Sequence, residues 1–298
     1  MRRCVVRREG IMLEHVDRVQ LAVRDRAAAA EIFAHVFAGE VVADDEVRAL
    51  AARRRTVRSG RAQFELLEPA GDGPVAAYVA EWNEGLFAGG FSTKDVGAVA
   101  ARLGERGVAF AEEGGQLFIA PDQTPGLRMV ISAERDESSP GLLRYLYEVT
   151  NLIDDHMAAA KFYSDTFGLD ASRFSPINSR EYGYTGQLTL FNPPERLDRI
   201  ELSQITDWER PMGRFMKRRG GQTLYMCYAE ADDLAPIVER LRARNLRFAP
   251  HDAAGNVNGI FVHPSALKGM LMGVSRTNVA WTWSGRPDLA PAGARAGH

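Results

Sequence analysis

Hydrophobic and polar positions along the chain form a repeating block, in which one strand and one helix precede several short strands. Residues 16–23 are an apolar-rich run that is typical of a strand, and residues 27–33 form an alanine-rich stretch that predicts a helix. Asp25 stands between them as a candidate N-cap, because its carboxylate can accept hydrogen bonds from the first free helical amides. The short strands expected after this helix lie at residues 53–57 and 62–67.

The same block occurs again in the first half of the chain and twice in the second half. A strand is expected at 85–93 and a helix at 95–105, and short strands are expected near residues 108, 116 and 127–132. The second half has predicted helices at 155–167 and 232–244. We therefore predict an α+β fold of four βαβββ modules, which form two cup-shaped, curved antiparallel sheets with the helices outside.

The two halves of the chain also resemble each other in sequence. Residues 19–33 recur at 149–163, an offset of 130 residues, and residues 102–111 recur at 240–249, an offset of 138 residues. A growing offset is expected for a duplicated domain whose copies differ by loop insertions. The expected domains are residues 12–135 and 142–277, followed by a partly disordered tail at 278–298; residues 1–11 are expected outside the fold.

Composition excludes several classes of protein. The 298 residues include 37 Lys and Arg against 39 Asp and Glu, a net charge of −2 that lacks the basic excess of a nucleic-acid-binding protein. No apolar stretch approaches the roughly 18 residues of a membrane span, and residues 1–10 lack the features of a secretory signal. Two cysteines exclude a disulfide scaffold. We expect a cytoplasmic monomer or homodimer whose partner is a small molecule.

Four segments carry a family resemblance, and they lie at residues 19–33, 63–70, 232–241 and 261–269. They resemble methylmalonyl-CoA epimerases and, more broadly, the vicinal oxygen chelate superfamily, which also contains glyoxalase I, bleomycin-resistance proteins and type I extradiol dioxygenases. A chain of four modules resembles the two-domain dioxygenases or a fused dimer of small members. The resemblance implies paired modules that curl into a cup with the active site inside.

The resemblance also implies where a metal ion would be bound. Metal-dependent members use His or Glu on the first strand, Glu or Gln on the strand that ends the first module, His on the next strand and Glu on the last. The corresponding residues are Arg18, Glu65 or Gln63, Ala88 and Val130 in the first half, and Glu148, Glu201, Met226 and Gly273 in the second. Arginine has no lone pair to donate, and alanine, valine and glycine offer no ligand. We expect no catalytic metal and no other cofactor.

Two acids remain at the mapped positions of the second half. Glu148 and Glu201 are the expected catalytic pair, since neighbouring carboxylates move each other's pKa apart and can then act as acid and base. We see no obvious basic partner for either residue in the sequence. The alternative is that one or both side chains point outward to water.

Other residues are candidates for substrate binding. Tyr145, Tyr225 and Met226 are expected to contact a ligand in the second cup, where many tyrosines favour stacking and hydrogen bonding to an aromatic or oxygenated molecule. His263 is a candidate contact, or it holds a turn before Pro264. The last two candidates, Arg18 and Glu65, either bind ligand or fill the first cup as an ion pair. Residues 216–220 form a basic patch, either a plain loop or a contact for a carboxylate or phosphate.

Three functions remain open. The first is a metal-independent lyase, isomerase or epimerase that acts on a small oxygenated or aromatic substrate. The second is a binding or resistance protein that sequesters a hydrophobic or aromatic ligand. The third is a divergent metal-dependent extradiol dioxygenase or epimerase. An enzyme of the first kind should bury at least one carboxylate at the base of the second cup, whereas a sequestering protein needs only apolar and aromatic walls.

Overall fold

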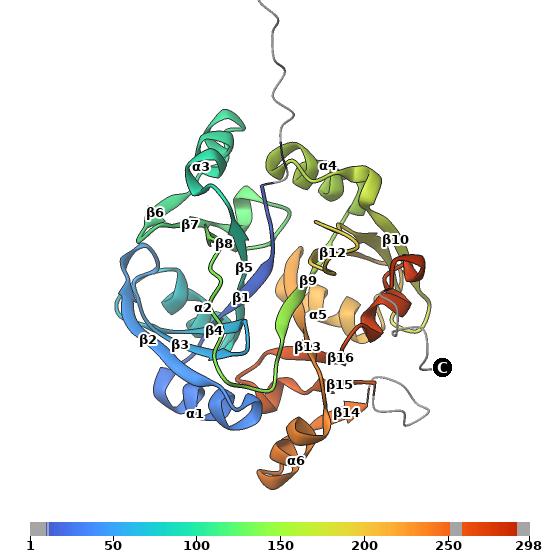
Figure 1. Cartoon of the computed structure of the whole chain (residues 1–298). Helices are drawn as coiled ribbons and strands as arrows, with labels where there is room; N and C mark the ends of the chain where they lie inside the picture. The colour runs from blue at the N-terminus through green and yellow to red at the C-terminus, as the bar shows by residue number, and fades with distance from the viewer. Residues whose placement is uncertain (1–9, 11, 251–257, 291–298) are drawn as a thin grey trace, which may run out of the picture.

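A computed structural model describes residues 10, 12–250 and 258–290, and it contains two curled sheets of eight strands each (Figure 1). The first sheet consists of β1 (Val16–Ala22), β2 (Glu40–Val47), β3 (Ala52–Ser59), β4 (Ala62–Pro69), β5 (Gly85–Thr93), β6 (Ala111–Glu113), β7 (Gln116–Ile119) and β8 (Met129–Ala133). The second sheet consists of β9 (Tyr145–Ile153), β10 (Ser175–Ser179), β11 (Tyr184–Leu188), β12 (Arg199–Ile205), β13 (Thr223–Ala231), β14 (Phe248–Pro250), β15 (Gly259–Val262) and β16 (Leu271–Arg276).

Six α-helices accompany the sheets in the described part of the chain. They are α1 (Arg26–Phe37), α2 (Pro74–Trp82), α3 (Val96–Glu105), α4 (His156–Phe167), α5 (Pro211–Arg219) and α6 (Ala235–Ala243). Helices α1, α3, α4 and α6 lie around the periphery of the sheets, as Figure 1 shows. Each sheet contains the strands of two βαβββ modules, so the predicted α+β fold with its duplicated sheet is confirmed.

The strand order is the same in both sheets, β2-β3-β4-β1-β5-β8-β7-β6 and β10-β11-β12-β9-β13-β16-β15-β14. The sheets are mixed, because β1 runs parallel to β4 and β5 runs parallel to β8. The expected antiparallel pairing is therefore wrong for these pairs and for β9–β12 and β13–β16, whereas the remaining pairs are antiparallel. Helix α1 connects the end of β1 to the start of β2 and allows β2 to run in the same direction as β1. Strand β3 runs antiparallel to both β2 and β4, so β1, β2 and β4 share one direction.

Aspartate caps start the first helix of each half, as the sequence predicts for the first. The Asp25 carboxylate accepts hydrogen bonds from the amides of Ala27 and Ala28, both at 2.9 Å. Asp155 accepts from the amides of Met157 and Ala158 at 2.9 and 3.0 Å in α4. These bonds satisfy backbone donors that the helix itself leaves free, and they fix where each helix begins.

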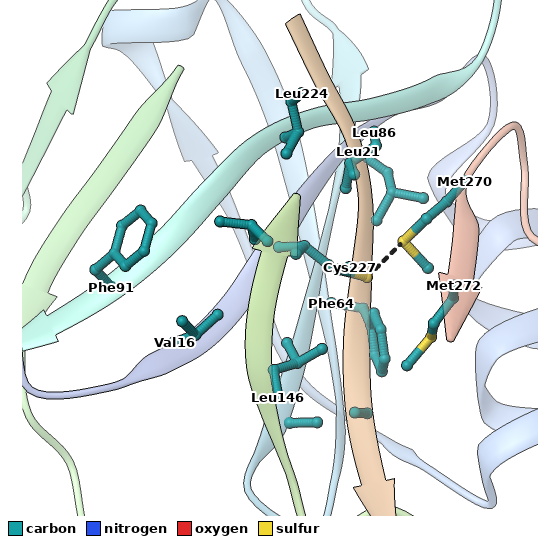
Figure 2. Close-up of a cluster of buried hydrophobic side chains, with 14 of the residues drawn as sticks. Val16, Leu21, Phe64, Leu86, Phe91, Leu146, Leu224, Cys227, Met270 and Met272 are labelled. Atoms are coloured by element: carbon teal, nitrogen blue, oxygen red, sulfur yellow. Dashed lines mark hydrogen bonds between the residues drawn. The ribbon is translucent and has the colours of Figure 1, made fainter. Parts of the chain in front are cut away.

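One hydrophobic core extends across both halves (Figure 2). Val16 and Phe91 of the first sheet lie in the same buried cluster as Leu146, Leu224 and Cys227 of the second. Helix α1 packs against α6, and α3 packs against α4, so both ends of the junction are covered. The two sheets therefore pack on each other through a shared apolar interior.

The chain beyond β16 is structured as far as it is described. Residues Val279–Trp283 and Pro287–Leu289 form 3-10 helices, and the Trp281 side chain is buried against the second sheet. Residues 278–290 of the tail, which was expected to be partly disordered, are ordered, because two tryptophans give this segment apolar surface to bury. The remaining tail, 291–298, and residues 1–9 and 11 lie outside the described residues. None of the described helices has the length and apolar character needed to cross a bilayer.

Candidate active site

The concave face of the second sheet, which we call the second cup, encloses a cavity of about 620 Å3. This volume lies within the range of sites that hold small molecules. Its apolar and aromatic walls are formed by Ile177, Tyr182, Tyr184, Leu188, Met212, Tyr225, Met226, Tyr228, Phe261, Leu271 and Trp283. Its polar lining includes Glu148, Thr150, Asn178, Ser179, Arg199 and Glu201. The cavity thus combines a mostly apolar wall with a small cluster of charged groups.

The strand register explains which side chains share the floor of the second cup. Glu148 on β9 pairs with Arg199 on β12 and with Tyr228 on β13, and Tyr228 pairs with Gly273 on β16. Side chains two residues apart on a strand share a face. Thr150, Glu201 and Met226 therefore form a second row of the floor, two positions farther along the same strands.

Glu148 is held by a buried ion pair. Arg199 donates from Nε and Nη2 to Glu148 Oε2, at 2.7 and 2.5 Å, while Thr150 Oγ1 donates to Oε1 at 2.9 Å. Glu148 and Arg199 are each 1% exposed. The expectation that both acids lack a basic partner was therefore wrong for Glu148. Arg199 lies two residues before Glu201, so an arginine on the same strand face was the signal that our sequence analysis missed.

Glu201 has a different environment. Ser203 Oγ donates to its Oε1 at 2.7 Å, and within the described residues no lysine, arginine or histidine nitrogen approaches it to ion-pair distance. Burial, followed by the negative charge of Glu148, raises the pKa of Glu201 to about 8. In its neutral form Glu201 hydrogen-bonds to Glu148. Glu148 thus has Arg199 as its ion-pair partner, whereas the environment of Glu201 favours its protonated form.

Tyrosine hydroxyls surround these acids. Burial raises the pKa of the Tyr184, Tyr225 and Tyr228 hydroxyls above the ordinary value, and the charge of Glu201 adds to this effect at Tyr184. These groups therefore stay protonated and can donate hydrogen bonds at neutral pH. Tyr225 was predicted as a ligand contact, whereas Tyr184 and Tyr228 were expected only as members of the tyrosine-rich second half, some of which could line the cup. Tyr228 lies two residues after Met226 on the same strand face, which was the available signal.

The donor set of the second cup does not fit a catalytic divalent ion. Glu148 is engaged by Arg199, whose positive charge lies where a cation would have to approach. Gly273 stands where the resemblance expects a carboxylate, and a Cβ there would lie 2.0 Å from the Tyr228 ring. No group of three or more His, Cys, Asp and Glu side chains in the described ranges could hold a metal ion. The floor is occupied by an ion pair and an aromatic ring instead.

The other predicted contacts separate into two groups. Tyr225 and Met226 line the second cup. Tyr145 lies outside the cavity lining, where its hydroxyl donates to Glu230 at 2.9 Å and its ring lies 4.0 Å from the Arg196 guanidinium. His263 is also outside the lining, and its Nδ1 accepts from the Ser265 amide at 3.1 Å. This is the turn-holding role that we gave as the alternative for His263.

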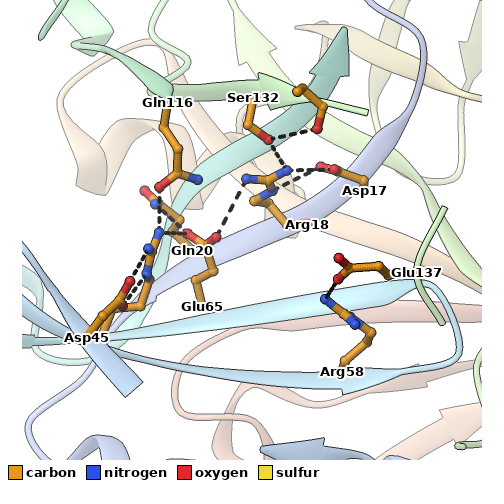
Figure 3. A network of polar contacts seen from close by, with 11 residues as sticks. Asp17, Arg18, Gln20, Asp45, Arg58, Glu65, Gln116, Ser132 and Glu137 are labelled. Carbon is orange, nitrogen blue, oxygen red and sulfur yellow. Dashed lines mark hydrogen bonds and ion pairs between the residues drawn. The ribbon is translucent and has the colours of Figure 1, made fainter. Parts of the chain in front are cut away.

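The concave face of the first sheet, the first cup, is filled by a polar network (Figure 3). Arg18 Nη1 lies 3.6 Å from Glu65 Oε1, and Arg54 Nη1 lies 3.3 Å from Glu65 Oε2, which also accepts from Gln20 at 2.8 Å. The remaining cavity is about 350 Å3. Arg18 passes over Gly90, where a Cβ would lie 1.9 Å from the Arg18 Cγ. The structure therefore favours the ion-pair interpretation of Arg18 and Glu65.

Residues 216–220 are not a plain loop. They form the end of α5, which reaches Arg219 and is followed by Gly220 in the left-handed conformation. This helix was missed because it ends in three consecutive basic residues and its buried face consists only of Met212, Gly213 and Met216. The patch lies on the outer end of a helix that lines the second cup through its first turn.

Comparisons with known proteins support this architecture. No protein-family profile matches the chain. A mitochondrial methylmalonyl-CoA epimerase of Dictyostelium discoideum is 30% identical over 113 residues, which is 37% of this chain and 64% of the epimerase. The match thus spans less than two thirds of that relative's length.

One solved structure shows the same fold over nearly the whole chain. A mutant of 4-hydroxymandelate synthase from Streptomyces coelicolor superposes with a TM-score of 0.68, covering 94% of this chain and 99% of the synthase at 14% identity. Methylmalonyl-CoA epimerase from Mycobacterium tuberculosis aligns over 45% of this chain and 89% of the epimerase chain, with a TM-score of 0.38 and 21% identity. The near-complete coverage of the synthase shows that the four-module arrangement occurs as one chain in another protein.

Proposed function

We propose that this chain, which has the fold of the vicinal oxygen chelate superfamily, is an enzyme that moves a proton on a small substrate in its second cup. The reaction class is that of an isomerase, epimerase or lyase. The observation that carries the proposal is the state of Glu201, a buried carboxyl whose pKa is raised to about 8 beside the anion of Glu148. A pKa near the operating pH suits a group that both gives and takes protons.

The two acids have separate roles in this proposal. Arg199 pairs with Glu148 and fixes its position, and the charge of Glu148 helps to hold the proton on Glu201. Ionised Glu201 takes a proton from a carbon next to a carbonyl group, the carbonyl becomes an enolate, and neutral Glu201 then returns the proton to carbon. Such acid–base catalysis contributes about 10² to 10⁴ in rate.

The tyrosines supply hydrogen bonds to the enolate oxygen. Tyr184 and Tyr228 are protonated donors in a cavity with mostly apolar and aromatic walls, where a hydrogen bond to a developing negative charge is worth more than in solution. Removing one such donor typically costs about 10²-fold or more in rate. The chain's own residues thus provide both the proton-transfer group and the stabilisation of the intermediate.

The walls of the second cup suggest the substrate class. Phe261, Leu271 and Trp283 offer apolar and aromatic contacts, while the floor offers the acid–base group. A small carbonyl compound with an apolar or aromatic body and an acidic C–H bond fits this division. Methylmalonyl-CoA and 4-hydroxymandelate, named for the similar proteins, are suitable first compounds within a panel of such carbon acids.

Proton exchange tests the proposal without requiring the natural reaction. The full chain is incubated with each carbon acid in D2O, and loss of the C–H signal is followed by proton NMR. We expect exchange with at least one compound, and we expect Glu201→Gln to slow it by about 10²-fold or more. Glu239→Gln is the matched control, because it makes the same chemical change on the exposed face of α6. Exchange that survives Glu201→Gln would contradict the proposed role.

A binding protein is the second candidate, and the largely aromatic wall of the second cup favours it. Such a protein would bind aromatic compounds with saturation but would exchange no proton on any of them. Glu201→Gln would then leave affinity almost unchanged or raise it, since the cavity becomes permanently uncharged at that position. Binding without exchange across the whole panel would replace the enzyme proposal with this one.

A further inference from the structure

A separate cavity of about 300 Å3 lies where the two halves meet, and we call it the junction pocket. It shares no lining residue with the second cup. The first half contributes α2, β5 and the segment before β8, while the second half contributes the end of α5 and the start of β13. Its main side chains are Tyr78, Trp82, Phe87, Arg128, Arg219 and Leu224.

Arg128 is the first unusual feature of the junction pocket. Its guanidinium carbon lies 4.4 Å from the centre of the Phe87 ring, and no carboxylate of the described residues lies within ion-pair distance of it. Burial lowers the pKa of Arg128 to about 10, although the charge of Asp122 opposes the shift. The side chain is therefore still a cation at neutral pH, with guanidinium donors that no described carboxylate engages. Burying a charge without a partner is costly, and a bound anion would offset that cost.

Arg219 brings a second cation to the same pocket. Its guanidinium carbon lies 4.5 Å from the Trp82 ring centre and 5.1 Å from the Tyr78 ring centre, and its Nη2 donates to the Tyr78 hydroxyl at 2.8 Å. No ion pair to a carboxylate occupies Arg219 within the described ranges either. Among the lining residues, Glu81 is the acid, and its side chain is exposed. Two arginines and three aromatic rings thus converge on one cavity.

We propose that the junction pocket binds a small aromatic anion, a planar ring that carries one carboxylate or phosphate group. Arginine presents a planar set of donors that matches either anion in two parallel hydrogen bonds. Tyr78, Trp82 and Phe87 offer ring faces and edges on which a planar ligand can stack. A volume of about 300 Å3 is at the lower end for ligand sites, so it suits one ring system rather than a dinucleotide.

Binding of matched anionic and neutral compounds to the full chain tests this inference. The probes are salicylate against salicylamide, AMP against adenosine, and inorganic phosphate alone, each measured by titration calorimetry. We expect salicylate or AMP to bind with saturation and about tenfold or more tighter than its neutral counterpart. Salicylate alone would assign the carboxylate form of the ligand, and AMP alone would assign the phosphate form. Absence of binding by both anions, or equal binding of the neutral compounds, would overturn the inference.

Substitutions locate the binding. Arg128→Gln and Arg219→Gln should each weaken the anion by about tenfold or more, because each removes one charged donor. Arg218→Gln is the matched control, since the same change one residue earlier falls on an exposed side chain outside the pocket. Thermal melts confirm that each variant is folded, and Glu201→Gln should leave this affinity unchanged. Unaltered binding in both pocket variants would contradict the assignment, whatever the outcome for the second cup.

Discussion

Replacing Glu201 by glutamine should stabilise the protein at neutral and alkaline pH. The folded protein holds the proton of Glu201 with a pKa of about 8, whereas an unfolded chain releases it at an ordinary value of 4.5. Below pH 4.5 the carboxyl is neutral in both states, so it causes no difference. Between pH 4.5 and 8 the unfolded state has lost its proton and the folded state has not, so the free energy of unfolding falls as pH rises. Above pH 8 the loss levels off.

The magnitude follows from the size of the shift. The change from 4.5 to about 8 corresponds to at most about 5 kcal/mol, and its growth between pH 5.5 and 8.5 amounts to about 3 kcal/mol. Glutamine has nearly the same shape, and its amide can donate toward Glu148 as the neutral acid does. The variant should therefore avoid this loss while retaining the packing.

Urea denaturation of the parent and of Glu201→Gln at pH 5.5, 7.0 and 8.5 measures the effect. The difference between the two proteins removes the contributions of all other titrating groups. We expect the advantage of the variant to grow by up to about 3 kcal/mol across this range. A difference that is independent of pH, or that shrinks as pH rises, would refute the argument that Glu201 is buried with its proton.

Three further predictions follow from the same contacts. Glu148→Gln should destabilise the protein by about 3 to 5 kcal/mol, because Arg199 would be left buried without its partner; urea denaturation measures this, and a change of less than about 1 kcal/mol would contradict the ion pair. Residues 12–138 expressed alone should aggregate or dimerise, because the shared core becomes exposed; a monodisperse monomer in size-exclusion chromatography would count against it. Protein purified without added metal should carry no stoichiometric Fe, Mn, Ni or Zn, because Glu148 is engaged by Arg199 and Gly273 offers no ligand; nearly one equivalent by elemental analysis would contradict this.

The fold could be predicted because its signals are local and occur twice. Asp25 and Asp155 each precede an alanine-rich helix, and the strand at 85–93 was predicted at the bounds of β5. Strand β2 was missed because seven of its eight residues are exposed, so its few apolar residues do not alternate with polar ones along the strand. Helix α2 was missed because it follows a turn-rich segment and buries only Val75.

The candidate site was predicted in part. Glu148, Glu201, Tyr225 and Met226 are brought together in the second cup, as expected from the strand positions given by the resemblance. The charge balance of that cup was not predictable in the same way, because it depends on the pairing register between β9 and β12. That register places Arg199 beside Glu148. The sequence alone showed two acids. The pairing of β9 with β12 places the Arg199 cation beside Glu148, and this gives the two acids different environments.

The titration of Glu201 itself tests the central claim most directly. Carbon-13 NMR of the side-chain carboxyls of the folded protein follows each group as pH changes, and the signal absent from Glu201→Gln identifies this residue. We predict a midpoint near 8, because burial and the anion of Glu148 disfavour the charged form. A midpoint near the ordinary value of 4.5 would show that Glu201 is an unperturbed carboxylate, and it would contradict the proposed proton transfer in the second cup.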